Sequence, residues 1–308
     1  MTVATKAGVV AVRSVEFSVR DIERSVRFYE NAFALETIAQ SDGMRYLRAA
    51  GSEHHVLVLR SGDVPGIASV ELAVADRAGI DDLHERLAPG ALAVTAPAEC
   101  DLPGGGYGFS FIDASGRHWQ LSAGVTPHTQ SENTADRPFK VSHVVLNATE
   151  IANDIAFATD YLGFRVRDES KSMFFLGCNS DHHSLAFTRM GNTALNHVAF
   201  EVRDMDALMR NAGRMKRSGF PIHWGVGRHG PGANVYSYFL DPDFLPVEYT
   251  TEIMQIDDAT YRPGTPADWV RPPFFDAWGL ADPPTPDFLA ASGGAHTKSE
   301  RRSSWRTM

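Results

Sequence analysis

The chain has 308 residues, of which 43% are hydrophobic and 22% charged, and its formal net charge is −9. This composition is typical of a globular protein with room for two domains, and the acidic balance without a clustered basic face argues against nucleic-acid binding. Two cysteines, Cys100 and Cys178, allow neither a disulfide framework nor a cysteine-rich zinc site. No apolar run approaches a membrane span and no secretory pattern opens the chain, so we expect a cytoplasmic protein.

The first half of the chain opens with a strand-like segment at residues 14–19, followed by apolar residues at helical spacing over 21–33. Short strands are expected at 44–49 and 55–59, an apolar strand at 69–74 and a second helix at 79–87. A strand that follows an Asp- and Gly-containing turn, within 113–121, closes this half. The order of strands and helices is that of two βαβββ units in tandem.

The second half repeats this pattern at a lag of about 128 residues. Residues 142–147 parallel 14–19, residues 196–201 parallel 69–74, and residues 241–249 parallel 113–121. Helical patterns recur at 151–162 and 205–217, and short strands at 173–177 and 184–188. A repeat of this kind indicates a duplicated unit. We therefore predict an α+β fold of two domains, residues 1–126 and 138–260, joined by a polar linker at 127–137.

The remaining segment, residues 261–308, has a different composition. Its many prolines rule out a long helix or an interior strand. Four aromatic residues indicate that its first part packs on the body of the protein and covers the mouth of a pocket: Trp269, Phe274, Phe275 and Trp278. From about Ala290 to Met308 the composition favours disorder.

Three metal-capable side chains stand on apolar strands of the second half. His143 and His197 are 54 residues apart, and Glu248 follows 51 residues later. Two imidazoles and one carboxylate form the set that non-haem Fe(II) oxygenases use, which leaves positions for substrate and dioxygen. The first half has Val15, Val70 and Gln120 at the positions that we align with them, so we expect it to be a structural module without ligands. Burying the Glu248 carboxylate on an apolar strand is costly unless it is paired or bound to a metal, so a metal ion is its expected partner.

Three segments around Glu248 resemble a known family signature. They are Gly227-Arg228-His229-Gly230, then Tyr236-Ser237-Tyr238-Phe239-Leu240-Asp241-Pro242-Asp243, then Val247-Glu248-Tyr249. The chain, over residues 8 to 260, looks like a type I extradiol (catechol meta-cleavage) dioxygenase of the vicinal oxygen chelate superfamily. Pro231-Gly232 and Phe244 depart from that pattern, the first within the presumed substrate loop.

The resemblance implies the vicinal oxygen chelate, or glyoxalase-like, fold: paired βαβββ units in open, curved, mixed sheets. It implies Fe2+, or Mn2+ as in some members, held by His143, His197 and Glu248 in the second module. It also implies that the members form homo-oligomers. His229 and Tyr238 resemble residues that hydrogen-bond the bound catechol.

An acid–base histidine stands 14 or 15 residues before the second ligand in the family, and Asp181-His182-His183-Ser184-Leu185 lies at that place here. Strand alternation lets only one histidine of the pair face the metal, and we choose His183 at a distance of 14. The first half carries His54-His55 at the corresponding place. The pair therefore belongs partly to the scaffold.

The expected activity is ring cleavage of a catechol beside its diol, with both atoms of O2 entering a muconate-semialdehyde-type product of aromatic catabolism. The pocket is expected near Phe175, Phe187, Phe200 and the loop with Trp224. Two alternatives stay open: a 4-hydroxyphenylpyruvate-dioxygenase-like enzyme, and a non-catalytic ligand-binding protein of the same fold. A glyoxalase-type isomerase is disfavoured, because that chemistry needs a fourth protein ligand.

Overall fold

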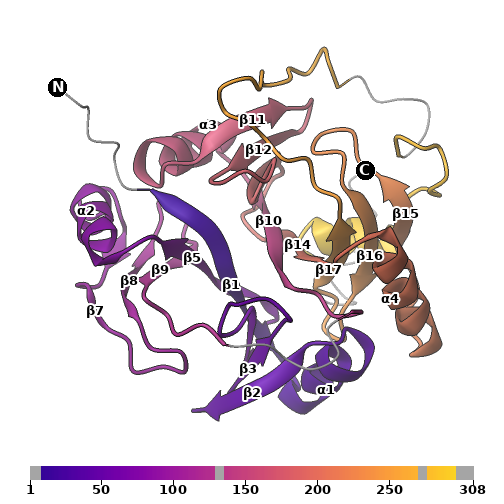
Figure 1. The fold of residues 1–308 in the computed structure, drawn as a ribbon, viewed down its shortest axis with the longest axis horizontal. Coiled ribbons are helices and arrows are strands. Elements are labelled where there is room, and N and C mark those ends of the chain that lie inside the picture. The colour runs from indigo at the N-terminus through magenta and orange to yellow at the C-terminus, as the bar shows by residue number, and fades with distance from the viewer. Residues whose placement is uncertain (1–7, 129–134, 270–275, 296–308) are drawn as a thin grey trace.

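A computed structural model describes residues 8–128, 135–269 and 276–295. Each half of the chain forms one mixed β-sheet with two helical segments, and the two halves lie side by side (Figure 1). The predicted α+β architecture of two repeated modules is confirmed. In the described ranges, no helix has both the length and the apolar character needed to cross a membrane.

The first module contains nine strands, two α-helices and one π-helical turn. These are β1 (Val9–Val19), α1 (Ile22–Arg27), η1 (Phe28–Ala32), β2 (Glu36–Ser41), β3 (Met44–Arg48), β4 (Leu57–Ser61), β5 (Gly66–Val74), α2 (Arg77–Leu87), β6 (Ala93–Val94), β7 (Ala98–Glu99), β8 (Tyr107–Ile112) and β9 (His118–Ala123). Its strands run in the order β2-β3-β4-β1-β5-β9-β8-β6, with β7 paired to β8.

The second module repeats this plan with eight strands. Its elements are β10 (Lys140–Ala148), α3 (Ile151–Ala156), η2 (Phe157–Tyr161), β11 (Arg165–Glu169), β12 (Met173–Gly177), β13 (Leu185–Arg189), β14 (Leu195–Glu201), α4 (Met205–Arg217), β15 (Trp224–Arg228), β16 (Val235–Leu240) and β17 (Pro246–Thr251). The strand order β11-β12-β13-β10-β14-β17-β16-β15 matches the first sheet position by position.

Equivalent aspartates begin the second helix of each module. The carboxylate of Asp76 accepts a hydrogen bond from Gly79 N at 2.8 Å, and that of Asp204 accepts one from Ala207 N at 2.7 Å. Each satisfies an amide that the first helical turn leaves without an intrahelical partner. The repeat therefore extends to the capping residues that fix where each helix starts.

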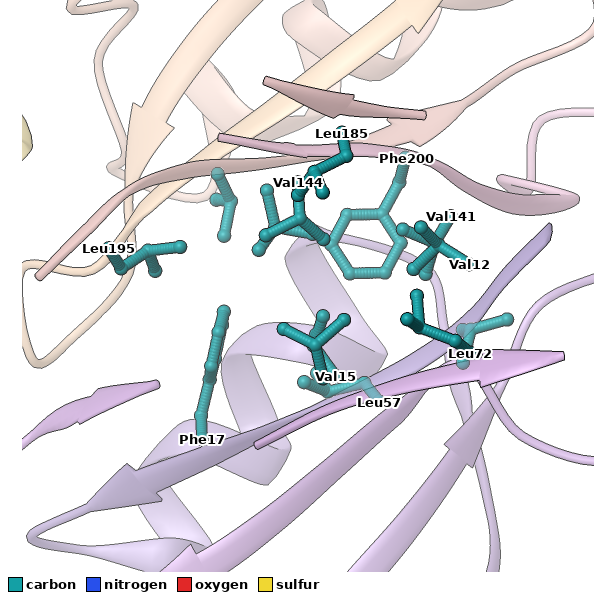
Figure 2. Close-up of a cluster of buried hydrophobic side chains, with 14 of the residues drawn as sticks. Val12, Val15, Phe17, Leu57, Leu72, Val141, Val144, Leu185, Leu195 and Phe200 are labelled. Carbon is teal, nitrogen blue, oxygen red and sulfur yellow. The ribbon is translucent and has the colours of Figure 1, made fainter. Parts of the chain in front are cut away.

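The main core lies between the two sheets. Figure 2 shows side chains of both modules pointing toward one another, among them Val15 and Phe17 from β1 and Val144 and Leu195 from β10 and β14. Burying this apolar surface from two sheets at once favours a fixed arrangement of the modules. Phe187 and Phe200, which we expected near the pocket, are instead fully buried in this core.

Polar contacts join the modules at the turn between β8 and β9. Arg117 donates to the carboxylate of Asp154 on α3 at 2.7 and 3.0 Å, and to Asn147 O at 2.7 Å. Asp113, on the same turn, contacts the guanidinium at 3.3 Å. Arg117 and Asp154 are both buried, so each charge depends on the other for compensation.

We expect Asp154→Ala to lower the free energy of unfolding by about 3–5 kcal/mol, because it leaves the buried Arg117 guanidinium short of a partner. Urea unfolding followed by circular dichroism measures the change. Asp160→Ala, an exposed position on the same helical segment, is the control and should shift stability by less than about 0.5 kcal/mol. Equal effects of the two substitutions would contradict this account of the interface.

The segment after β17 returns to the second module and ends in a short helix, α5 (Pro286–Ser292). Thr285 caps α5, Pro286 occupies its first turn, and Phe288 packs on Trp224 and Tyr238. The expectation of disorder from Ala290 onward is therefore wrong for residues 290–295, because α5 is anchored through its apolar face. Residues 296–308, together with Phe274 and Phe275, lie outside the described ranges.

Candidate active site

Three neighbouring strands of the second sheet bring His143, His197 and Glu248 together. His143 on β10 and Glu248 on β17 both lie in register with Ala199 on β14, the strand between them. His197 precedes Ala199 by two residues and so projects from the same face. Because Ala199 contributes only a methyl group, the larger side chains converge above it. One potential ligand atom from each of the three lies within 4.8 Å of the others.

Burial and hydrogen bonding prepare these three side chains for a cation. Glu248 is 0% exposed, and its Oε2 lies 3.2 Å from His143 Nε2 and 3.3 Å from His197 Nε2. Burial raises the pKa of Glu248, but the charges and hydrogen bonds of His143 and His197 outweigh this and lower it below its ordinary value. The carboxylate is therefore ionised. A buried carboxylate with two imidazoles fits a divalent transition metal.

Contacts at Nδ1 fix the orientation of the two imidazole rings, His143 and His197. His197 Nδ1 donates to Asn196 Oδ1 at 2.8 Å, and His143 Nδ1 lies 3.3 Å from Ser142 Oγ. A hydrogen bond from Nδ1–H leaves the Nε2 lone pair free for a metal, which is how such partners select the ligating tautomer. Asn196 gave no signal in the sequence beyond standing next to His197.

The register corrects our alignment of the two modules. Val15 pairs with Leu57 as Val144 pairs with Leu185, so Val15 is the counterpart of Val144 and points into the core. The residue before it, Ser14, therefore matches His143. A shift of one residue exchanges the two faces of a strand, so this difference decides which side chain faces the site.

By the same reasoning Ser69 matches His197, while Gln120 matches Glu248 as we expected. The position of Ala199 is taken by Glu71, whose carboxylate accepts hydrogen bonds from Ser14 Oγ at 2.7 Å and Ser122 Oγ at 2.5 Å. Arg13 Nε lies 3.6 Å from the same carboxylate. The first module thus fills the corresponding space with its own ion pair.

The two histidines that precede β13 face different surroundings. His183 lines the cavity above the three ligand-capable residues, with its ring centroid 4.4 Å from that of His143. His182 turns away and its Nε2 lies 2.8 Å from Asp168 Oδ2. Burial, and then the neighbouring His143, lower the pKa of His183 well below its ordinary value. A neutral imidazole at this place can accept a proton.

His229 and Tyr238, which line the same cavity, form a hydrogen-bonded pair, with His229 Nε2 2.9 Å from Tyr238 Oη. Burial lowers the pKa of His229 to about 4, and burial with the charge of Glu248 raises the pKa of Tyr238 well above 10. Both groups are therefore neutral at pH 7. A neutral phenol retains its O–H and can donate to an oxygen in the cavity.

These groups line one end of a cavity of about 690 Å³. The rest of its wall is mostly apolar and includes Phe175 and Trp224, two of the residues expected there. The segment after β17 adds further side chains to the wall: Pro266, Trp269, Asp276, Ala277 and Phe288. Of the aromatic residues predicted to cover the pocket mouth, Trp269 lines the cavity and Trp278 does not. Asn234 is also part of the wall, and its Nδ2 lies 2.8 Å from Thr250 Oγ1 and 3.4 Å from Glu248 Oε1.

The chain belongs to the Glyoxalase/Bleomycin resistance protein/Dioxygenase superfamily, whose family model matches residues 11–121 and 140–249. It is 25% identical to the metapyrocatechase of Pseudomonas sp. (strain CF600) over 287 residues, or 86% of this chain and 92% of that protein. A second relative, metapyrocatechase 2 of Cupriavidus necator, is 33% identical over 119 residues, which span 38% of this chain and 37% of that protein.

A solved structure also aligns with nearly the whole chain. The Mn(II)-bound glyoxalase from Novosphingobium aromaticivorans has a TM-score of 0.83 and 35% identity, and the match covers 90% of this chain and 92% of that one. The two matched segments of the family model coincide with the two sheets. The relatives' names include both ring-cleaving enzymes and a glyoxalase. These two activities must therefore be distinguished by the residues and geometry of the site.

Proposed function

We propose that the protein is an extradiol dioxygenase that cleaves a catechol-type ring beside its two hydroxyl groups and inserts both atoms of O2. The observation that carries the proposal is that His183, His229 and Tyr238 line the same cavity as His143 and His197. These two histidines form the metal-capable cluster with Glu248. The names of the two metapyrocatechase relatives support it. The product would be a ring-opened muconate-semialdehyde-type compound of aromatic catabolism.

His143, His197 and Glu248 would hold Fe2+, with Mn2+ as the alternative suggested by the Mn(II)-bound structural relative. Such an ion would bind the catechol as its anion and provide the redox centre through which the catechol's own electrons reach dioxygen. One carboxylate against two neutral imidazoles leaves net positive charge at the centre, which favours an anionic diol. A reducing cytoplasm would keep iron ferrous, and we propose that location and a homo-oligomeric assembly.

The remaining polar groups would act on the substrate's own atoms. Tyr238, held as a neutral phenol and oriented by His229 at 2.9 Å, donates a hydrogen bond to a substrate oxygen as negative charge grows on it. His183 takes a proton from the diol and returns it when the oxygen–oxygen bond breaks.

The test is anaerobic purification with metal analysis, followed by oxygen uptake and near-ultraviolet absorbance with a panel of catechols. We expect bound iron or manganese, stoichiometric oxygen consumption and a yellow product. Metal without turnover of any catechol would move the assignment to another oxygenase of this fold, such as a 4-hydroxyphenylpyruvate-dioxygenase-like enzyme. A chain that takes up neither Fe2+ nor Mn2+ would be a binding protein.

A glyoxalase activity is the second candidate, because the structural relative with 35% identity carries that name. Among the described residues, the cluster of metal-capable side chains has three members and no fourth carboxylate or imidazole within the same 4.8 Å. The hemithioacetal of methylglyoxal and glutathione is the discriminating substrate. Its isomerisation by the metal-loaded protein, in the absence of catechol turnover, would favour this candidate.

The cavity is larger than a single catechol ring needs, and we expect a substituted diol to contact Trp269. Trp269→Ala should raise KM for a bulky aryl catechol by about 10-fold while leaving kcat nearly unchanged, because it removes apolar contact remote from the ring. Trp278→Ala is the matched control, since Trp278 stands in the same segment but is 40% exposed and does not line the cavity. Equal KM values for all three proteins would remove Trp269 from the substrate site.

A further inference from the structure

A chain of buried hydrogen bonds runs behind His183, away from the cavity. His183 Nδ1 lies 3.0 Å from His182 Nδ1, and His182 Nε2 lies 2.8 Å from Asp168 Oδ2 on β11. His182 and Asp168 are both 0% exposed. Neither lines the cavity, so neither can touch a substrate directly.

The protein holds the Asp168 carboxylate as an acceptor. Its Oδ1 receives the backbone N–H of Gly264 at 2.6 Å and the hydroxyl of Tyr261 at 2.9 Å. Both donors come from the proline-rich segment after β17, which pairs with β11 at this point through the bridge between Asp168 and Gly264. With Oδ1 engaged by two donors, Oδ2 is left to accept from His182 Nε2–H.

This arrangement determines which nitrogen of His183 carries the proton. If Nε2 of neutral His182 is protonated, its Nδ1 holds a lone pair and can only accept. His183 must then donate from Nδ1–H, which leaves its Nε2 as the unprotonated nitrogen available to the cavity. When Nε2 gains a proton, the resulting imidazolium still donates to His182, and the carboxylate of Asp168 stabilises the charge through it.

The first module provides an internal comparison. It has the same histidine pair, with His54 Nδ1 3.1 Å from His55 Nδ1. Ala39 pairs with Tyr46 as Asp168 pairs with Phe175, so Ala39 stands where the second module has Asp168. The histidine pair thus belongs to the duplicated scaffold, whereas the carboxylate occurs only in the module with the three ligand-capable residues.

The loop that carries His229 packs against the same pair. At Gly232, where φ is +76°, an added Cβ would lie 3.1 Å from Nδ1 of both His182 and His183. The backbone therefore closes over the contact between the two imidazoles and leaves no space for a side chain there. Gly232 thus packs against both nitrogen atoms of the hydrogen bond between the two rings.

We propose that His182 and Asp168 are positioning residues that set the Nδ1–H tautomer of His183 and keep its Nε2 ready to accept a proton. The catalytic part of this inference rests on the proposed dioxygenase function, while the tautomer does not. Asp168→Asn is the informative change, because its amide can donate to His182 Nε2 and so reverse the tautomers of both histidines. The amide oxygen can still accept from Gly264 and Tyr261.

The first measurement is long-range ¹⁵N–¹H NMR of the imidazoles in the full chain loaded with diamagnetic Zn2+. We expect His183 to be protonated at Nδ1 in the unmodified protein and at Nε2 in Asp168→Asn. An Nε2-protonated His183 in the unmodified protein, or an unchanged tautomer in the variant, overturns the proposal. This measurement requires no turnover, so it decides the tautomer even if no catechol is a substrate.

The second measurement is steady-state kinetics on an accepted catechol. Asp168→Asn should lower kcat by about 10–100-fold, the usual cost of losing a group that orients a site residue, with metal content retained and KM changed less than about twofold. His54→Gln changes the first module's counterpart of His182 and should leave kcat unchanged. If Asp168→Asn does not fold by circular dichroism, His182→Gln interrupts the same chain and should lower kcat similarly. An unchanged kcat in the folded variant overturns the proposal.

Discussion

Glu248→Gln is expected to remove the bound metal and with it all ring cleavage. The substitution keeps the size of the side chain but replaces the only anion of the three ligand-capable residues with a neutral amide. The two remaining imidazoles would then have to hold a dication without a compensating charge in a fully buried place. The loss of metal affinity should exceed the roughly 10–100-fold that follows when a ligand loses only a hydrogen-bonding partner.

Metal analysis after anaerobic reconstitution with Fe2+ measures this loss, and melting temperature verifies that the variant is folded. Gln120→Ala is the matched control, because Gln120 occupies the position of Glu248 in the first module. It should retain full metal content. Undiminished iron in Glu248→Gln would show that the metal lies elsewhere and would remove the basis of the proposed function.

The duplication made most of the fold predictable. Aspartate caps, apolar strands and helical patterns recur at near-constant lag, and each recurrence supported the assignment of its counterpart. The equivalence of Glu248 in the second module and Gln120 in the first followed from the same lag. What the sequence could not supply was the register of β1 against β10 to within one residue. Both strands carry irregularities beside their neighbours, between Val12 and Ser14 and between Val141 and His143.

A shift of one residue in this register moves a side chain from the core face of the strand to the face that carries the site. The sequence around Val15 predicts a strand but does not show which face of the sheet its side chain occupies. The pairing of Val15 with Leu57 places it on the core face. The role of Ala199 was similarly hidden, because an alanine in an apolar strand carries no signal of its own. Its importance emerges from the contrast with Glu71, which stands at the same place and closes the first module's site.

The surroundings of His183 were predictable only in part. His183 lines the cavity and His182 does not, but the pair precedes β13, so alternation along a strand, from which we chose His183, is not the physical reason. Asp168 lies 14 residues from His182 in the sequence, and Tyr261 lies 79 residues away on the other side. Contacts of such sequence separation depend on the path of the segment after β17, for which composition gave no register.

His183→Gln is expected to lower kcat by about 10²–10⁴-fold, the range that removal of a general acid–base group commonly costs. Glutamine retains a polar side chain of similar reach, with an NH2 group that donates and an oxygen that accepts, but it cannot take up a proton and return it. Because His183 is not among the three ligand-capable residues, metal content should be unchanged. KM should change little, since the substrate would be held by the metal and by Tyr238.

The control is His55→Gln, the equivalent position of the first module, where the imidazole Nε2 lies 3.7 Å from Glu71 and does not line the 690 Å³ cavity. It should alter stability and leave kcat intact. A decisive extension combines His183→Gln with Asp168→Asn. If Asp168 acts only through His183, the second substitution should cost no further activity once His183 is gone, whereas independent roles would give additive losses. Full activity of His183→Gln alone would contradict its assignment as the acid–base group. Another group of the cavity would then have to carry the proton, and His229, a neutral imidazole, would be the next candidate.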